Sequence, residues 1–102
     1  MKLRLGMSPI SWSNDDLPQL GGETSLQTCL IETREAGFTG TETGGKFPKD
    51  AAALSAVLGA HDLALVSGWY SGTLINNSLE EELERIAEQL ALFNQCGASV
   101  IV

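Results

Sequence analysis

The chain has 102 residues, of which 43% are hydrophobic, and its 6 basic and 13 acidic side chains give a formal net charge of −7. This length is sufficient for one domain with a modest core. The acidic balance argues against nucleic acid as a partner, because no positive field attracts phosphates. The apolar runs are too short to span a membrane and the first residues lack an apolar signal core, so we expect a cytoplasmic protein without a membrane partner.

The first predicted strand comprises residues 3–7, in which apolar and less apolar side chains alternate. Residues 11–22 are rich in Pro, Gly, Ser, Asn and Asp, which excludes a regular element. A connection of this length is typical of a functional loop. Thr24 and Gln27 then predict a capping box for a helix that ends at Gly37.

The second strand–helix unit begins with residues 39–43, where β-branched threonines predict a strand. Asp50 is the predicted cap of a helix that ends near His61. Residues 63–67 form a continuous apolar run, which is typical of a parallel strand covered on both faces.

The third unit continues with an irregular loop at residues 68–77. Ser78 and Glu81 predict a capping box, and apolar residues at helical spacing predict the helix that follows. Residues 97–102 have the pattern of a helix terminator and the start of a fourth strand. The chain therefore predicts three strand–helix units followed by a strand.

This alternation is typical of an open doubly wound sheet or of a (β/α)8 barrel. A nucleotide-binding open sheet would have a Gly-x-Gly-x-x-Gly turn after its first strand, and residues 6–11 do not supply it. We therefore predict an α/β fold that is the amino-terminal half of a (β/α)8 barrel. Residues 1–102 are expected to form a truncated portion of that single domain.

Aromatic and polar residues follow the ends of all three predicted strands, where the active sites of barrels lie. Aromatic faces suit the apolar C–H faces of a polyhydroxylated ring, whose hydroxyls require hydrogen-bonding groups, so a carbohydrate-like ligand is indicated. The alternatives are that the tryptophans only fill the top of the barrel and that Glu42 and Lys46 form an exposed ion pair. The residues concerned are Trp12, Asn14, Glu42, Lys46, Trp69 and Tyr70.

The remaining candidate groups have structural interpretations. Cys29 and Cys96 match no metal-binding or redox spacing, so two reduced, partly buried thiols are expected. The acidic run at residues 80–84 predicts a solvated helix face, with Glu81 paired to Arg85. In the first long loop, we expect the consecutive acidic pair Asp15-Asp16 to cap the loop and form turns.

Three segments, residues 6–22, 35–48 and 65–72, resemble the amino-terminal part of the inosose dehydratases, which belong to the xylose-isomerase-like (β/α)8 barrels. Sugar-isomerase-like relatives share the Ala-Gly-Phe-x-Gly-x-Glu element that ends at Glu42. They lack the Trp-Ser-Asn-Asp run that begins at Trp12. The resemblance implies a carbon–oxygen lyase of inositol catabolism that removes water from 2-keto-myo-inositol to give a trihydroxycyclohexane dione.

The resemblance also implies a divalent manganese or cobalt ion and an association with glutathione. Such a metal polarises a ketone and stabilises enediolate oxygens, and it prefers carboxylate and imidazole ligands. In this superfamily those ligands come from later strands, so we expect no metal ligand in this chain. The single histidine, His61, is expected to provide a favourable charge at a helix end.

The resemblance gives each candidate a role: Glu42 would orient a hydroxyl or relay a proton. Asn14 and Lys46 would bind ring oxygens, while Trp69 would stack against the substrate and Tyr70 would donate a hydrogen bond. Trp12 is a further candidate for substrate binding. Thr41 and Thr43 depart from the pattern, because apolar residues are expected beside Glu42.

Two other functions remain open, a sugar isomerase or epimerase of the same superfamily and a non-catalytic remnant. Half a barrel exposes two unpaired edges and an uncovered inner face. We therefore expect the chain to associate with itself or with the missing carboxyl-terminal half.

Overall fold

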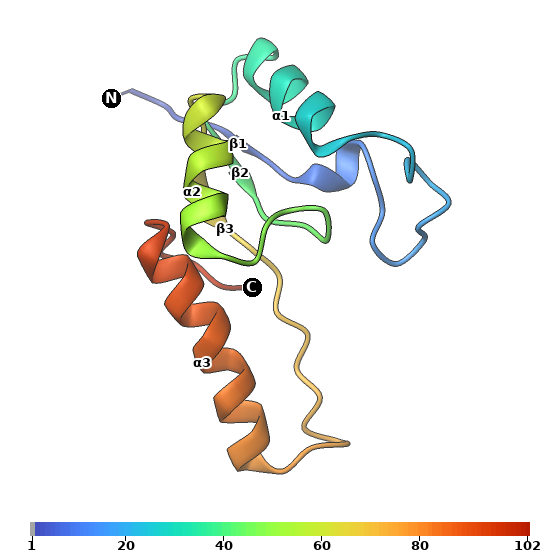
Figure 1. Cartoon of the computed structure of the whole chain (residues 1–102), viewed down its shortest axis with the longest axis vertical. Helices are drawn as coiled ribbons and strands as arrows, with labels where there is room; N and C mark the ends of the chain where they lie inside the picture. The colour runs from blue at the N-terminus through green and yellow to red at the C-terminus, as the bar shows by residue number, and fades with distance from the viewer. Residues whose placement is uncertain (1) are drawn as a thin grey trace.

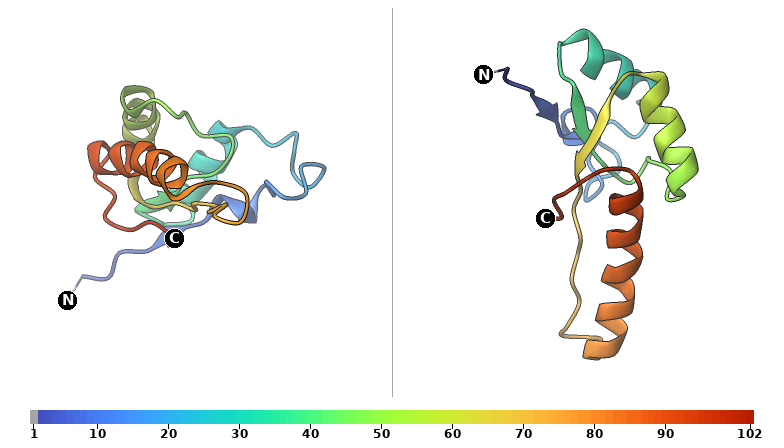
Figure 2. Two further views of the ribbon diagram at one scale, coloured as in Figure 1. Left: turned by 90° about the horizontal axis from the view of Figure 1, so that it is seen from below. Right: turned by 90° about the vertical axis from the view of Figure 1, so that its left-hand side faces the viewer.

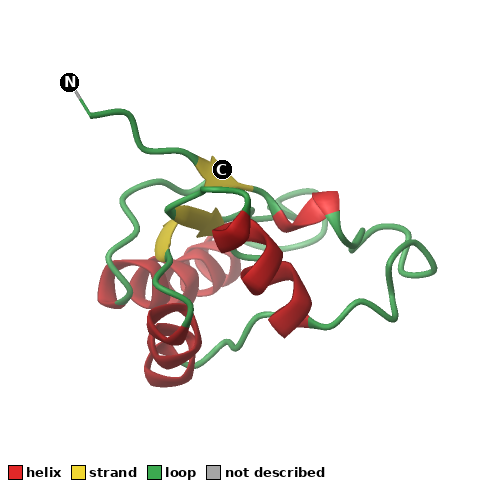
Figure 3. Ribbon diagram, turned by 90° about the horizontal axis from the view of Figure 1, so that it is seen from above, coloured by secondary structure: helices red, strands yellow, loops and turns green. Residues whose placement is uncertain are grey.

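The computed structural model describes residues 2–102 and contains three short strands and three α-helices that alternate along the chain (Figure 1). The predicted α/β class is confirmed, although the strands are shorter than predicted and much of the chain is loop (Figure 3). In chain order the elements are β1 (Gly6–Met7), the 3-10 turn η1 (Pro9–Ser11), α1 (Leu26–Glu35), β2 (Gly40–Glu42), α2 (Ala51–Ala60), β3 (Ala64–Ser67) and α3 (Leu79–Gln95).

Side-chain caps define where the helices begin. The Asp50 cap of α2 and the capping box of Ser78 and Glu81 in α3 are confirmed. The predicted box at the start of α1 is wrong, because Ser25 rather than Thr24 caps that helix. Thr24 still belongs to the loop, where its backbone N–H donates to a loop carbonyl.

The three strands form one parallel sheet in the order β1-β2-β3, with Thr41 of β2 opposite both Met7 and Leu65. Residues 98–102 do not form the predicted fourth strand. Val102 alone makes a parallel bridge, since its N–H donates to the Gly68 carbonyl (3.0 Å) and its carbonyl accepts from the Tyr70 N–H (2.7 Å).

The position of Val102 bears on the choice between the two architectures. A fourth strand of a Rossmann-type doubly wound sheet lies beside the first strand, whereas the fourth strand of a (β/α)8 barrel lies beside the third. Val102 lies beside the residues that follow β3. The arrangement is therefore compatible with part of a barrel and favours it over that open sheet.

The hydrophobic core lies between the sheet and the helices, all of which cover the same face (Figure 2). Leu65 of β3 is buried on this face, and Thr41 beside it is also buried. The core side chains are Leu30, Phe47, Leu54, Leu58, Leu63, Leu65 and Phe93.

The opposite face of the sheet is uncovered. Along β3, burial alternates, so that Leu65 and Ser67 are buried while Ala64 and Val66 are exposed. The prediction that this strand is covered on both faces is wrong for this chain, because the helices lie on one side only. Val66 on this face is 39% exposed.

Both cysteines are free thiols, as predicted, with Cys29 buried and Cys96 half-buried. Burial raises the pKa of the Cys29 thiol, which disfavours the reactive thiolate. Among the helices of residues 2–102, none is both long and apolar enough to cross a membrane.

Candidate functional site at the carboxyl edge of the sheet

A polar contact at the carboxyl edge joins the ends of β2 and β3. The Ser67 hydroxyl donates to Oε1 of Glu42 at 2.7 Å, and the Thr43 N–H donates to the Ser67 carbonyl at 3.0 Å. The β2–β3 register shifts between Thr41 and Glu42, which brings Glu42 opposite Ser67. A half-buried carboxylate is thereby held at the edge where barrel sites form.

Lys46 does not pair with Glu42, so the alternative of an ion pair between them is wrong. The Lys46 ammonium instead donates to three backbone carbonyls of the preceding loop, those of Gly21 (2.9 Å), Gly22 (3.2 Å) and Thr24. These three carbonyls account for its three N–H donors.

Trp12 and Asn14 lie in the long loop that follows η1, and both are half-buried. The Trp12 indole N–H donates to the Glu32 carboxylate on α1. The Asn14 side-chain oxygen accepts from the N–H groups of Asp16 (2.9 Å) and Leu17 (3.0 Å), which is a local turn. The structure therefore places both side chains in contacts that shape the loop.

Trp69 and Tyr70 follow β3 but differ in their surroundings. The Trp69 side chain is 71% exposed, while its carbonyl accepts from the Gln89 side chain of α3 at 3.0 Å. The Tyr70 hydroxyl donates to the Glu82 carboxylate on the same helix. Of this pair, Trp69 alone has a side chain that is open to a ligand.

Glu82 holds the loop after β3 against α3. Although it belongs to the acidic run that we expected to be solvated, it is only 7% exposed. Arg85 pairs with Glu82 rather than with Glu81, whose side chain completes the capping box. Besides Tyr70, the donors to the Glu82 carboxylate are the Thr73 N–H (3.1 Å), the Thr73 hydroxyl (3.2 Å), the Asn77 amide (3.4 Å) and the Arg85 guanidinium (3.4 Å).

These hydrogen bonds affect the pKa of both partners. The Tyr70 hydroxyl is the main reason that the pKa of Glu82 is lowered from its ordinary value of 4.5, with burial acting in the opposite direction. The same bond raises the pKa of Tyr70. Glu82 therefore favours its ionised form in the folded chain.

Replacement of Glu82 by glutamine is expected to destabilise the chain at neutral pH and to have less effect in acid. Because the folded pKa is below the unfolded one, the stabilisation is complete above about 4.5 and is lost as the pH falls through the folded pKa. Urea unfolding of the parent and of Glu82→Gln between neutral and acidic pH measures this difference.

Glu84→Gln is the matched control, because Glu84 is an exposed carboxylate on the same helix. Its unfolding free energy should follow that of the parent at each pH. A constant difference between the parent and Glu82→Gln across the whole pH range would contradict the assigned role.

Sequence reasoning missed the burial of Glu82 and the hydrogen-bond partners of Ser67 and Asp15. Asp15 caps a loop as predicted, but it caps the loop after β2, where the Gly45 N–H donates to it at 2.8 Å. The sequence places Ser67 at the polar end of an apolar strand but gives no signal of its bond to Glu42. Glu82 gives no such signal, since its neighbours in the sequence are also glutamates.

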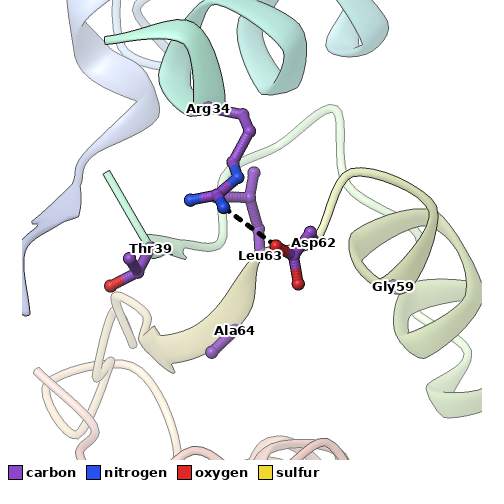
Figure 4. A pocket seen from close by; sticks show the side chains of 6 residues that line it. All are labelled: Arg34, Thr39, Gly59, Asp62, Leu63 and Ala64. Carbon is purple, nitrogen blue, oxygen red and sulfur yellow. Dashed lines mark hydrogen bonds and ion pairs between the residues drawn. The ribbon is translucent and has the colours of Figure 1, made fainter. Parts of the chain in front are cut away.

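A separate pocket of about 330 Å³ lies at the opposite, amino-terminal edge of the strands (Figure 4). Figure 4 shows Arg34 and Asp62 directed toward each other across it, with an ion-pair distance of 2.9 Å. Arg34 also donates to the Phe38 carbonyl at 3.2 Å. This pocket contains none of the predicted site residues.

The described residues do not fit the implied metal ion. Within residues 2–102 there is no group of three or more His, Cys, Asp or Glu side chains that could hold one. His61 hydrogen bonds through Nδ1 to the Val57 carbonyl at 2.8 Å, which places it at the end of α2.

The fold and the edge site define a class: an α/β protein of repeated βα units whose polar and aromatic candidates gather at the carboxyl ends of parallel strands. No protein-family model matches the chain. Individual proteins do match it over its whole length.

The chain is 45% identical over 102 residues to the rhizopine catabolism protein MocC of Rhizobium meliloti, covering 100% of this chain and 31% of that protein. It is 40% identical over 101 residues to an inosose dehydratase of Geobacillus thermodenitrificans, covering 99% of this chain and 34% of that enzyme. An inosose dehydratase of Clostridium perfringens is 39% identical over 100 residues, covering 98% of this chain and 34% of that enzyme.

The chain is thus homologous to inosose dehydratases, and the resemblance seen in its motifs is confirmed. It spans about a third of the length of these relatives.

Proposed function

We propose that this chain is part of an inosose dehydratase and forms one wall of its substrate site. The observation that carries the proposal is the 40% identity to the Geobacillus thermodenitrificans enzyme over almost the entire chain. The proposed reaction removes water from 2-keto-myo-inositol and gives a trihydroxycyclohexane dione. The proposed fold of the whole enzyme is a (β/α)8 barrel, which the sequential parallel order of β1, β2 and β3 supports.

Glu42 is the proposed proton-handling group. Elimination of water next to a ketone requires that a proton leave carbon and that the departing hydroxyl receive one, and a positioned carboxylate can carry out either transfer. The Ser67 hydroxyl fixes one carboxylate oxygen of Glu42, which limits the rotation of the side chain. The exposed Trp69 ring is the proposed stacking surface for the cyclitol ring.

Three further residues are proposed to contribute to the site. The Asn14 oxygen is used within its turn, so its amide N–H groups are the proposed donors to ring oxygens. Trp12 and Tyr70 are proposed to shape the pocket walls, since their polar atoms are bonded to Glu32 and Glu82.

A manganese or cobalt ion, when bound, would supply polarisation of the ketone. The described residues do not fit its ligand set, so we assign no step to it. The association with glutathione stays an expectation from the resemblance.

A chimaera tests the proposal. The 102-residue chain replaces the matching third of the Geobacillus thermodenitrificans enzyme, and the elimination of water from 2-keto-myo-inositol is measured. We expect dehydratase activity in the chimaera and none in the same enzyme with that third deleted. A folded chimaera that isomerises or epimerises ketoses without dehydrating the keto-inositol would support the alternative enzyme class. A folded, inactive chimaera would contradict the proposal and favour a non-catalytic remnant.

A role in rhizopine catabolism is the second candidate function, because the protein named for that process is 45% identical to the chain. The matching third of the Rhizobium meliloti protein can be replaced in the same way. Growth of that organism on rhizopine with the replaced protein, together with an inactive dehydratase chimaera, would favour this second function.

We propose that the uncovered face of the sheet is covered in the whole protein by further βα units of the same polypeptide. The exposure of Ala64 and Val66 on this face and the greater length of the relatives support this. In sedimentation experiments, the separate 102-residue chain should self-associate through this face at micromolar concentration. A compact, cooperatively unfolding monomer of the separate chain would contradict this prediction.

A further inference from the structure

The loop of residues 12–24 is tied at two points to the loop that follows β2. We propose that Lys46 and Asp15 form a clamp that fixes the loop of residues 12–24 as a preformed wall of the site. Lys46 is then a positioning residue rather than a ligand for ring oxygens. The existence of the clamp is independent of the proposed function, whereas its effect on substrate binding rests on that function.

The first half of the clamp is the Lys46 ammonium. An ammonium group has three N–H donors and no acceptor. In the structure this group donates to three carbonyl oxygens, those of Gly21 (2.9 Å), Gly22 (3.2 Å) and Thr24. Hydrogen bonds from a charged donor are stronger than neutral ones, so this contact secures the carboxyl-terminal end of the loop.

The second half of the clamp is the bond from the Gly45 N–H to the Asp15 carboxylate, at 2.8 Å. A Cβ atom at position 45 would lie 2.8 Å from Oδ1 of Asp15, so glycine permits the close approach. Asp15 lies near the amino-terminal end of the loop. The consecutive residues Gly45 and Lys46 therefore hold both ends.

The loop also closes on itself between these two points. The Asn14 N–H donates to the Leu20 carbonyl at 3.1 Å, and the Leu20 N–H donates to the Leu17 carbonyl at 2.8 Å. A compact loop whose ends are close is an Ω-type loop. In Figure 1 it projects from the body of the molecule between η1 and α1. The Trp12 indole bond to Glu32 also joins the loop to α1, at the residue where the loop begins.

A preformed wall lowers the ordering cost of binding a ligand. Loss of the clamp should therefore weaken substrate binding more than it slows the chemical step. In the chimaera, Lys46→Met should raise KM several-fold and leave kcat within about twofold.

Amide hydrogen exchange on the 102-residue chain tests the clamp without reference to activity. In Lys46→Met, the amides of Asn14, Leu20 and Thr24 should exchange about tenfold faster than in the parent, because local opening of the loop becomes easier. Amides in α2 and α3 should keep their rates. Lys49→Met is the matched control, since Lys49 is an exposed lysine three positions away.

Lys46→Arg keeps the charge and the donors and should restore most of the loop protection. Unchanged exchange of the loop amides in Lys46→Met, or an equal loss of protection in the loop and the helices, would overturn the clamp. If Lys46→Met does not fold, Asp15→Ala tests the clamp instead, because it removes the bond between Asp15 and the Gly45 N–H. Unaltered exchange of the loop amides in Asp15→Ala would then overturn the proposal. If the chimaera is inactive but exchange of the loop amides still depends on Lys46, the proposed function is contradicted and the clamp is retained.

Discussion

Replacement of Gly68 by alanine is expected to destabilise the chain by about 1–3 kcal/mol, a large part of the stability of a small domain. Gly68 is buried directly after β3, and its added methyl group would overlap the Thr43 hydroxyl and the Phe93 ring. The Thr43 hydroxyl can rotate away. The Phe93 ring is 3% exposed and belongs to the core, so displacing it costs packing contacts.

Gly59→Ala is the matched control for Gly68→Ala. Gly59 lies in α2, and a Cβ atom there would meet nothing within 4 Å. Alanine favours the helix by up to about 1 kcal/mol over glycine, so this variant should be slightly more stable than the parent. Urea unfolding followed by circular dichroism measures both. Equal urea midpoints for the two variants would contradict the steric overlap expected at Gly68.

Replacement of Glu42 by glutamine in the chimaera is expected to reduce kcat by roughly 10²- to 10⁴-fold, the usual contribution of a general acid or base. Glutamine has nearly the same shape, and its carbonyl oxygen can still accept from the Ser67 hydroxyl. It cannot take up a proton. The loss of activity should therefore occur without a loss of folding, which circular dichroism and thermal unfolding can check.

Two further variants separate a catalytic role of Glu42 from a structural one. Ser67→Ala removes the hydrogen bond that orients the carboxylate and should reduce kcat less than Glu42→Gln does. Glu88→Gln changes an exposed carboxylate of α3 and should leave kcat unaltered. Full turnover in Glu42→Gln would eliminate Glu42 as the proton-handling group.

The sequence alone predicted the succession of elements, because local signals decide it. The Asp50 cap and the Ser78–Glu81 box depend only on hydrogen bonds between near neighbours, and both predictions are confirmed. The cap of α1 was placed one residue early. Thr24 and Ser25 are both good caps, and the loop contacts of Thr24 decide between them.

The candidate site was only partly predictable. Parallel strands bring their carboxyl ends to one edge, so the sequence could place Glu42 and Trp69 at the same edge. It could not show that Ser67 orients Glu42, because that contact requires the register shift between β2 and β3. For Lys46 the sequence predicted either an ion pair with Glu42 or a contact to ring oxygens, and the loop carbonyls that it binds lie more than twenty residues away in the sequence.

Local sequence patterns predicted the βα repeat, the caps of α2 and α3, the two free thiols and the similarity to inosose dehydratases. The tertiary structure decided which polar groups meet. It buried Glu82 among the loop donors after β3, directed Lys46 to the loop carbonyls and left one face of β3 uncovered. The physical reason is that helix periodicity and capping depend on residues a few positions apart. Partners of a charged side chain depend instead on segments that only the packing of the chain brings together.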